Sequence, residues 1–234
     1  MLGPMRALQV ASSLAVSVFR LGSGLRVTHG AKTPEKLLEL YEFEACPYCR
    51  KVRETLSALD LDASVFPCPR GGERFRPTAI AKAGKRQFPV LVDPNTDTAM
   101  CESDDIVRYL TTTYGDGGVP LALRFGPLTD VSLKASSIFR AGRGRSARPS
   151  RAPKEPLELW SFEASPYCRL VRETLSTLEI PYVLHNVAKG SAKREAFVAR
   201  SGKMQVPYLV DPNTGKEMFE SADIVRYLEE TYGA

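Results

Sequence analysis

The sequence of 234 residues lacks long apolar runs and has few of the side chains that usually bind metals. A membrane-spanning helix needs roughly 18 or more consecutive apolar residues, so we expect no transmembrane segment. The chain has two histidines, and its five cysteines include a single Cys-x-x-Cys pair. That pattern does not fit a zinc site or a dense disulfide framework. We therefore expect no metal site, and the free thiols indicate a reducing compartment.

Acidic side chains are missing from residues 1–34, which contain four Lys or Arg and several Ser. This composition is typical of an organelle transit peptide. The alternative is a leading helix that belongs to a duplicated unit, because the pattern around Phe19 to Gly24 returns at Phe139 to Gly144. Both interpretations stay open. A secretory signal is disfavoured, since arginines follow the short apolar stretch too closely.

Positive charge is concentrated in two parts of the chain, residues 1–34 and residues 116–152. The chain carries a net charge of +5, and residues 116–152 alone hold seven basic and two acidic side chains. Such a segment is either a solvated connector or a contact for an anionic surface. No aromatic residue lies among Arg143 to Arg151, so no nucleic-acid partner is expected. Peripheral contact with a membrane stays open.

Two copies of one motif dominate the chain. Phe43 to Arg50 reads FEACPYCR, and Phe162 to Arg169 reads FEASPYCR. Apart from one extra residue in the first copy, the copies remain in register until Thr-Tyr-Gly closes each of them. We therefore divide the chain into four segments: residues 1–34, a basic or helical extension; 35–115, the first repeat; 116–152, a basic linker with a helix; and 153–234, the second repeat.

Each repeat is expected to fold in the order βαβαββα. In the first repeat the expected elements are a strand at 37–43, a helix at 47–59, a strand at 65–67, a helix at 73–83, a strand at 90–92, a further strand after the turn at 93–96 and a helix from Ser103. Ser103 is expected to cap that helix. In the second repeat they are 157–162, 166–178, 182–187, 191–201, 208–210, 216–219 and 221–232, in the same order.

The Cys-Pro-Tyr-Cys motif has the chemistry of a redox-active dithiol. Pro47 favours the first position of a helix, so unpaired backbone N–H groups would face the sulfur of Cys46 and stabilise its thiolate. Cys49, one turn later, could attack a mixed disulfide on Cys46 and close an intramolecular bond. We expect Cys46 to be the nucleophile and Cys49 the resolving thiol. Glu44 opposes this, because a nearby unpaired acid disfavours a thiolate.

This arrangement, with Cys-Pro-Tyr-Cys at the first helix, Pro89 opening the third strand and Glu102-Ser103 opening the last helix, resembles glutaredoxins and the N-terminal domain of glutathione transferases. More narrowly, it is similar to plastid proteins of plants and algae with two such domains. The resemblance implies an α/β fold of two tandem thioredoxin-like domains without the all-helical C-terminal domain of the transferases. It also implies a chloroplast location, the cytoplasm being the alternative, and glutathione as cosubstrate or ligand.

The resemblance also implies which residues bind glutathione. The prolines at 89 and 207 are expected to be cis, and Glu-Ser is expected to receive the γ-glutamyl end of the tripeptide. In the first repeat the implied glutathione-binding residues are Tyr48, Phe88, Pro89, Glu102, Ser103 and Asp104. In the second repeat the corresponding site consists of Ser165, Cys168, Val206, Pro207, Glu220 and Ser221. Ser165 replaces the nucleophile, so the second copy cannot perform dithiol exchange.

Three functions from different classes fit this pattern. The first is a glutathione-linked thiol-disulfide oxidoreductase, with repeat 1 redox active and repeat 2 a binding or docking copy; its partners would be glutathione and protein disulfides or glutathionylated proteins. The second is a noncatalytic glutathione-binding or interaction module. The third is glutathione transferase-like activity. An iron–sulfur cluster held by Cys46 and glutathione is disfavoured, because Pro47 stiffens the motif. The sequence favours an enzyme without establishing one.

Overall fold

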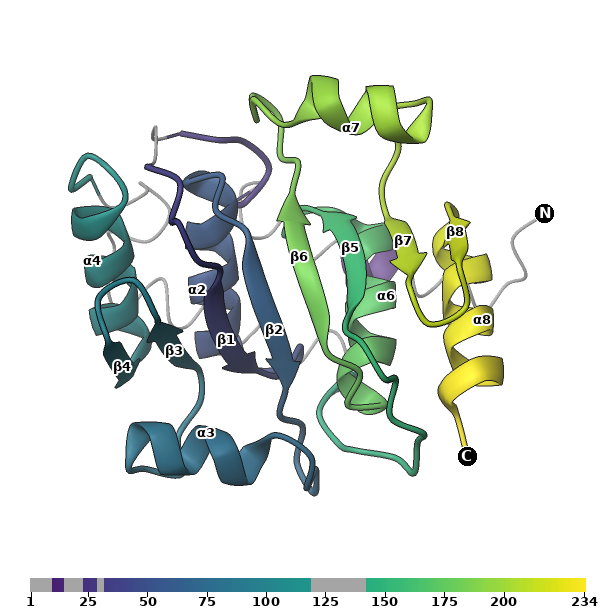
Figure 1. Cartoon of the computed structure of the whole chain (residues 1–234), viewed down its shortest axis with the longest axis horizontal. Helices are drawn as coiled ribbons and strands as arrows, with labels where there is room; N and C mark the ends of the chain where they lie inside the picture. The colour runs from purple at the N-terminus through teal and green to yellow at the C-terminus, as the bar shows by residue number, and fades with distance from the viewer. Residues whose placement is uncertain (1–9, 15–22, 29–31, 119–141) are drawn as a thin grey trace.

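The structure is a computed structural model, and it describes residues 10–14, 23–28, 32–118 and 142–234. The helix expected within the basic linker and most of residues 1–34 lie outside these ranges. In the described part of the chain, two sets of elements follow one another in the same order (Figure 1). None of the helices described is long and apolar enough to cross a membrane.

The first set contains β1 (Leu38–Glu42), α2 (Pro47–Ala58), β2 (Ala63–Pro67), α3 (Arg76–Ala83), β3 (Val90–Asp93), β4 (Thr98–Cys101) and α4 (Ser103–Thr113). The second contains β5 (Leu157–Ser161), α6 (Pro166–Thr177), β6 (Tyr182–Asn186), α7 (Arg194–Ser201), β7 (Tyr208–Asp211), β8 (Lys216–Met218) and α8 (Ser221–Tyr232). The expected order of elements is confirmed. Helix α3 begins three residues later than expected, because Pro77 fixes φ and lacks the N–H that an interior position needs.

All eight strands form one sheet in the order β4-β3-β1-β2-β6-β5-β7-β8. Within each set the first two strands are parallel, and the last two join antiparallel. Strands β2 and β6 pair antiparallel at the centre, with Val65 opposite Tyr182. The sheet is therefore continuous through both repeats, and its middle lies between them.

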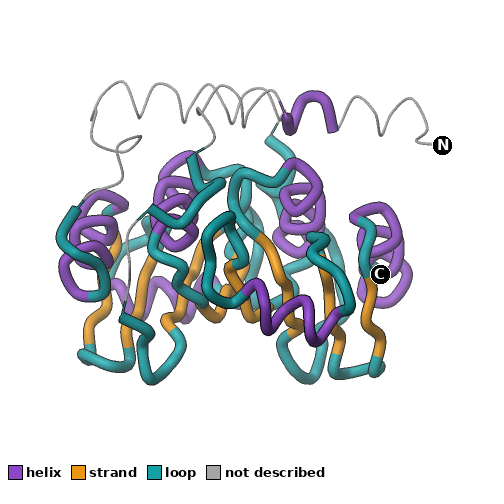
Figure 2. Tube along the Cα trace, turned by 90° about the horizontal axis from the view of Figure 1, so that it is seen from above, coloured by secondary structure: helices purple, strands orange, loops and turns teal. Residues whose placement is uncertain are grey.

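Helices α2, α4, α6 and α8 cover one face of the sheet, and α3 and α7 cover the other (Figure 2). Alternation along the strands explains this arrangement, since successive side chains of a strand point to opposite faces. Leu40 packs with Val52 and Ile106 beneath α2 and α4, whereas its neighbour Tyr41 packs with Ala79 of α3. The second repeat has the same two cores.

A short segment ahead of each repeat crosses to the other repeat. The Val27 N–H donates to the Lys189 carbonyl at 2.9 Å, and the Ala147 N–H donates to the Arg70 carbonyl at 2.9 Å. These pairs are equivalent between the two copies. Residues 23–28 and 143–148 therefore occupy matching places, which supports a duplicated unit that begins before the first strand. Within residues 142–151 the basic segment is hydrogen-bonded to both repeats rather than freely solvated.

Candidate functional site

Cys46 lies where α2 begins. Its Sγ accepts a hydrogen bond from the Cys49 N–H at 3.2 Å, so the thiol itself caps the helix. Pro47 occupies the start of the helix, as expected. The same Sγ lies 3.9 Å from the carbonyl oxygen of Phe88. The cap hydrogen bond and the positive end of the helix dipole favour negative charge on this sulfur.

The two thiols differ in acidity. Burial on its own raises the pKa of Cys46, but hydrogen bonds from the thiol and backbone amide of Cys49 outweigh it, and the net pKa is lowered. Burial raises the pKa of Cys49 well above its ordinary value, and the hydrogen bond and charge of Cys46 raise it further. This division fits a thiolate at the first position and a protonated thiol at the second. Cys46 is 4% exposed and Cys49 is fully buried.

The Phe88–Pro89 and Val206–Pro207 peptide bonds are both cis, which confirms that expectation. Strand β3 places Pro89 beside the start of α4, because Val90 is opposite Cys101 in the register of β3 and β4. The Phe88 carbonyl in turn contacts Cys46. The structure thus brings Cys46, the cis-proline turn and Glu102 to one end of the first repeat.

Glu102 and Glu220 have left-handed or otherwise unusual backbone conformations, with φ of 128° and 66°. Few residues other than glycine adopt such values, and they cost about 1–3 kcal/mol. Both glutamates are the N-caps of their helices, and no side-chain hydrogen bond caps either helix. Ser103, expected as the cap, is instead the first helical residue. The positive φ thus occurs at the same position in both copies.

Asp104 and Tyr48 differ in their surroundings. The Asp104 carboxylate forms an ion pair with Lys51 Nζ, which bridges α2 and α4. Because a lysine neutralises it, this carboxylate is less suited to receive the ammonium group of a ligand. Tyr48 is 38% exposed beside the motif and forms part of the surface around Cys46.

The second repeat retains the geometry without the nucleophile. Ser165 Oγ accepts from the Cys168 N–H at 3.3 Å, as Cys46 does in the first repeat. Cys168 is fully buried in the position of Cys49. Val206 and the cis Pro207 precede β7, and Gln205 Nε2 donates to the Glu220 carboxylate at 2.5 Å. Ser221 begins α8. The second site can therefore offer a hydroxyl and helix amides, but no dithiol.

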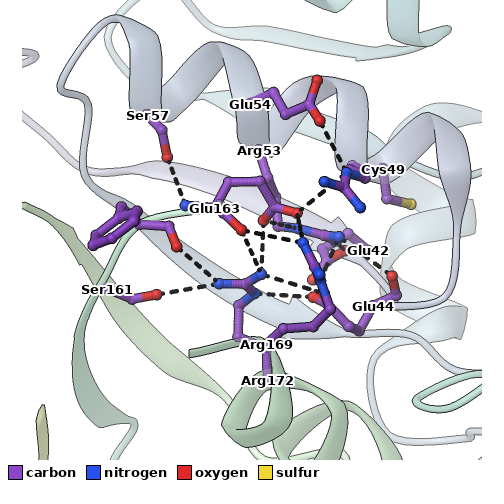
Figure 3. A network of polar contacts seen from close by, with 12 residues as sticks. Glu42, Glu44, Cys49, Arg53, Glu54, Ser57, Ser161, Glu163, Arg169 and Arg172 are labelled. Atoms are coloured by element: carbon purple, nitrogen blue, oxygen red, sulfur yellow. Dashed lines mark hydrogen bonds and ion pairs between the residues drawn. The ribbon is translucent and has the colours of Figure 1, made fainter. Parts of the chain in front are cut away.

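Glu44 does not act on Cys46 as an unpaired acid, contrary to our expectation. Its carboxylate lies 3.2 Å from Arg53 and 3.0 Å from Arg172 of the other repeat. Arg53 is 2% exposed and pairs with Glu163 at 2.9 Å. The Glu163 carboxylate also forms an ion pair with Arg172 at 2.8 Å. Equivalent residues thus exchange partners between the repeats (Figure 3).

Serines extend this exchange to the backbone. The Glu44 N–H donates to Ser176 Oγ at 3.3 Å, and the Glu163 N–H donates to Ser57 Oγ at 3.2 Å. We define the interface cluster as Glu42, Glu44, Arg50, Arg53, Glu163, Arg169 and Arg172. The sequence did not lead us to expect this cluster, because charged residues on a helix usually face solvent. The available signal was the repetition of the acid and both arginines at identical spacing in each copy.

Glu42 breaks the symmetry of the interface cluster. Its equivalent is Ser161, whose Oγ accepts from Arg172 at 3.2 Å, whereas the Glu42 carboxylate contacts Arg53. Burial raises the pKa of Glu42 to about 7, with Arg53 opposing and Glu44 adding to the shift. The charge of Glu42 raises the pKa of Cys46, and that of Arg53 lowers it. The two repeats thus differ at two positions: Cys46 corresponds to Ser165, and Glu42 corresponds to Ser161.

Within the described residues no group of three or more His, Cys, Asp or Glu could hold a metal ion. The five cysteines are all free thiols and all buried. His185 contacts Asp62 and its imidazole ring stacks on Trp160, so this histidine packs against other side chains of the protein.

Comparison with known proteins defines the class. The family model for the glutathione S-transferase N-terminal domain matches residues 40–118 and again residues 159–234. The chain belongs to that family. The two matches cover the two sets of elements described above.

Individual relatives share less. The chain is 31% identical over 81 residues to the glutathione S-transferase-like protein OpS6 of Beauveria bassiana; the match covers 35% of this chain and 37% of that protein. The chain thus spans little more than a third of the length of this curated relative. Among solved structures, the trimeric glutathione transferase TDR1 of Leishmania is similar at 14% identity and a TM-score of 0.30, over 84% of this chain and 69% of that one.

Proposed function

We propose that the protein is a glutathione-linked thiol-disulfide oxidoreductase in which the first repeat performs the exchange and the second binds or docks. The observation that carries this proposal is the hydrogen bond from the Cys49 N–H to Cys46 Sγ at 3.2 Å, together with the opposite pKa shifts of the two thiols. A lowered pKa at the helix start and a raised one a turn later are what sequential exchange requires.

The reaction would proceed in two thiol–disulfide exchange steps. The Cys46 thiolate attacks the glutathione sulfur of a glutathionylated protein, forming a Cys46–glutathione disulfide and releasing the protein thiolate, which takes up a proton. A second glutathione thiolate then attacks the glutathione sulfur, releasing oxidised glutathione and regenerating Cys46. Alternatively, Cys49 loses its proton and attacks Cys46 Sγ, releasing glutathione and leaving a Cys46–Cys49 disulfide.

The first repeat offers groups for each end of the tripeptide. We infer that Ser103 and the free amides of α4 receive the γ-glutamyl carboxylate, because a helix N-terminus favours an anion. We infer that Glu102 receives the ammonium group. Backbone groups beside Pro89 would pair with the cysteinyl part. The strained conformation of Glu102 supports this assignment, since it is repeated at Glu220.

We also infer that the two sets of elements are tandem thioredoxin-like units that need no all-helical domain for exchange, since both thiols come from the first repeat. The plastid resemblance favours a chloroplast location. An import assay of the full chain with isolated chloroplasts tests that location, and absence of protected protein after protease treatment would count against it.

The experiment is reduction of a mixed disulfide between glutathione and a cysteine peptide, coupled to glutathione reductase. Wild type and Cys49→Ser should turn over, and Cys46→Ser should not. The matched variant Cys168→Ser, which changes the equivalent of Cys49 in the second repeat, should retain wild-type activity. An inactive wild type that still binds glutathione by calorimetry would overturn the exchange reaction and leave the noncatalytic binding module. That second function is favoured by one observation, the 4% exposure of Cys46.

Transferase activity is the third candidate, favoured by membership of the family and by the similarity to a glutathione S-transferase-like protein. It would use bound glutathione thiolate against an electrophile, with Ser165 Oγ as a hydrogen-bond donor to that sulfur. Conjugation of 1-chloro-2,4-dinitrobenzene tests it. Activity that is lost in Ser165→Ala but unchanged in Cys46→Ser would favour this function over thiol exchange.

A further inference from the structure

A cavity opens between α6 and α8 of the second repeat. Its volume is about 540 Å³, which lies within the range of roughly 300–1,000 Å³ typical of small-molecule sites. Leu170 of α6 and Ala222 and Val225 of α8 supply apolar surface. Arg143 and Arg148 reach it from the segment that precedes the repeat. The cavity therefore combines an apolar wall with guanidinium groups.

The first repeat does not have this chemistry at the equivalent place. Lys51 and Asp104 stand where the second repeat has Leu170 and Ala222, and their ion pair joins α2 to α4 across the groove. Substitution of that ion pair by two uncharged side chains removes the bridge. The cavity of the second repeat lies at this place.

The arginines are also particular to the second repeat. Arg143 and Arg148 replace Ser23 and Thr28 of the matching leading segment. Ser23 Oγ donates to Glu54 at 2.8 Å and Thr28 donates its N–H to the Ala58 carbonyl. Both are neutral. Two positive charges have thus been added at the same repeat in which the lysine and aspartate are absent.

The charges around the cavity are not fully neutralised. Arg148 forms an ion pair with Glu229, and Arg226 pairs with Asp223 at 2.5 Å. Glu173 also lines the cavity; it is buried and is not without a partner. For Arg143, no acidic partner exists among the described residues. One exposed guanidinium beside an apolar wall is suited to a ligand with a single negative charge.

We propose that this cavity is a second binding site, which takes a compact organic anion: an apolar body against Leu170, Ala222 and Val225, and one carboxylate or sulfonate at Arg143. Ser221, the first residue of α8, also lines the cavity, and the flanks of α6 and α8 form most of its wall. The site does not depend on exchange at Cys46, and it needs no glutathione.

The test uses two fluorescent probes that differ by one charge: 8-anilinonaphthalene-1-sulfonate and the uncharged N-phenyl-1-naphthylamine. Wild type should bind the sulfonate at least tenfold more tightly than the neutral probe. Arg143→Ser, which installs the residue of the first repeat, should remove most of that preference. The pair Leu170→Lys with Ala222→Asp rebuilds the bridge of the first repeat and should weaken binding of both probes at least tenfold.

Arg108→Ser is the matched control, because Arg108 is the exposed equivalent of Arg226 on α4 and should leave probe binding unchanged. Thermal unfolding of each variant establishes that it is folded; if the double variant is not, Arg143→Ser still decides the charge preference. Equal affinity of the two probes for wild type, or unchanged affinity in Arg143→Ser, overturns the proposal. Displacement of the sulfonate by saturating glutathione overturns the independence of the two sites.

Discussion

Replacement of Glu163 by glutamine tests whether the interface cluster holds the two repeats together. The Glu163 side chain is 1% exposed and forms ion pairs with Arg172 at 2.8 Å and with Arg53 at 2.9 Å, each 2% exposed. Glutamine has nearly the same shape but no charge, so both guanidinium groups lose an anionic partner while still buried. Breaking a buried ion pair in this way costs about 3–5 kcal/mol. That is a large fraction of the roughly 5–15 kcal/mol that stabilises a folded domain.

The assay is urea unfolding of full-length Glu163→Gln, followed by circular dichroism. We expect the free energy of unfolding to fall by about 3–5 kcal/mol at pH 7. The control is Glu217→Gln, since Glu217 pairs with Arg200 at 3.0 Å but is half exposed. An exposed pair contributes about 0–1 kcal/mol. A loss below about 1 kcal/mol for Glu163→Gln would refute the reasoning, because it would mean that water reaches the cluster.

The pH dependence of the free energy of unfolding of Glu163→Gln provides an independent test. Burial acts to raise the pKa of Glu163, but Arg172 and then Arg53 outweigh it and hold the pKa well below the ordinary value of 4.5. A carboxyl whose pKa is lowered by folding contributes stability above its unfolded pKa, and this contribution is lost as the pH falls through the folded pKa. The difference between wild type and Glu163→Gln should therefore be largest above pH 5 and shrink in strong acid.

Three further predictions concern the first site. The rate of alkylation of Cys46 by iodoacetamide should rise with a midpoint below pH 9, because its pKa is lowered from that ordinary value, and Cys46→Ser should leave no fast-reacting thiol; a midpoint above pH 9 would contradict the helix-cap explanation. Glu42→Gln should remove a component of stability that wild type has at low pH and loses as the pH rises from about 4.5 through 7, since folding raises this pKa; equal pH profiles of unfolding in the two proteins would contradict this. Glu102→Gly should relieve the positive φ and raise the free energy of unfolding by about 1 kcal/mol while weakening glutathione binding measured by calorimetry, and no gain in stability would show that the conformation is unstrained.

Much of the fold follows from local patterns. The strand from Leu38 buries Leu38 and Leu40 on either side of the less buried Glu39, and Pro47 marks a helix start because only there is a missing N–H without cost. The candidate site was also accessible, since Cys46, Pro89 and Glu102 come from short motifs in fixed order. Two local details were wrong: α3 begins at Arg76 instead of residue 73, and Ser103 begins α4 rather than capping it, because the cap position is taken by a glutamate at positive φ.

The interface could not be predicted in the same way. Glu44 and Arg53 have the sequence context of solvated helix residues, and local periodicity does not distinguish a charge that faces water from one that faces another repeat. Their burial depends on the antiparallel pairing of β2 with β6, which brings α2 and α6 together. The open groove beside Leu170 likewise depends on which side chains α6 and α8 place opposite each other.

By itself, the sequence determined the two copies, the order of their elements and the difference between Cys46 and Ser165, because these depend on residue identity and short-range spacing. Only the tertiary structure decided that one sheet runs through both copies, that Glu44 serves the interface instead of opposing the thiolate, and that the second repeat has an open, positively charged cavity. The physical reason is that burial and ion pairing are set by partners distant in the sequence, as for Glu44 and Arg172, which are 128 residues apart, and no local pattern specifies which partner arrives.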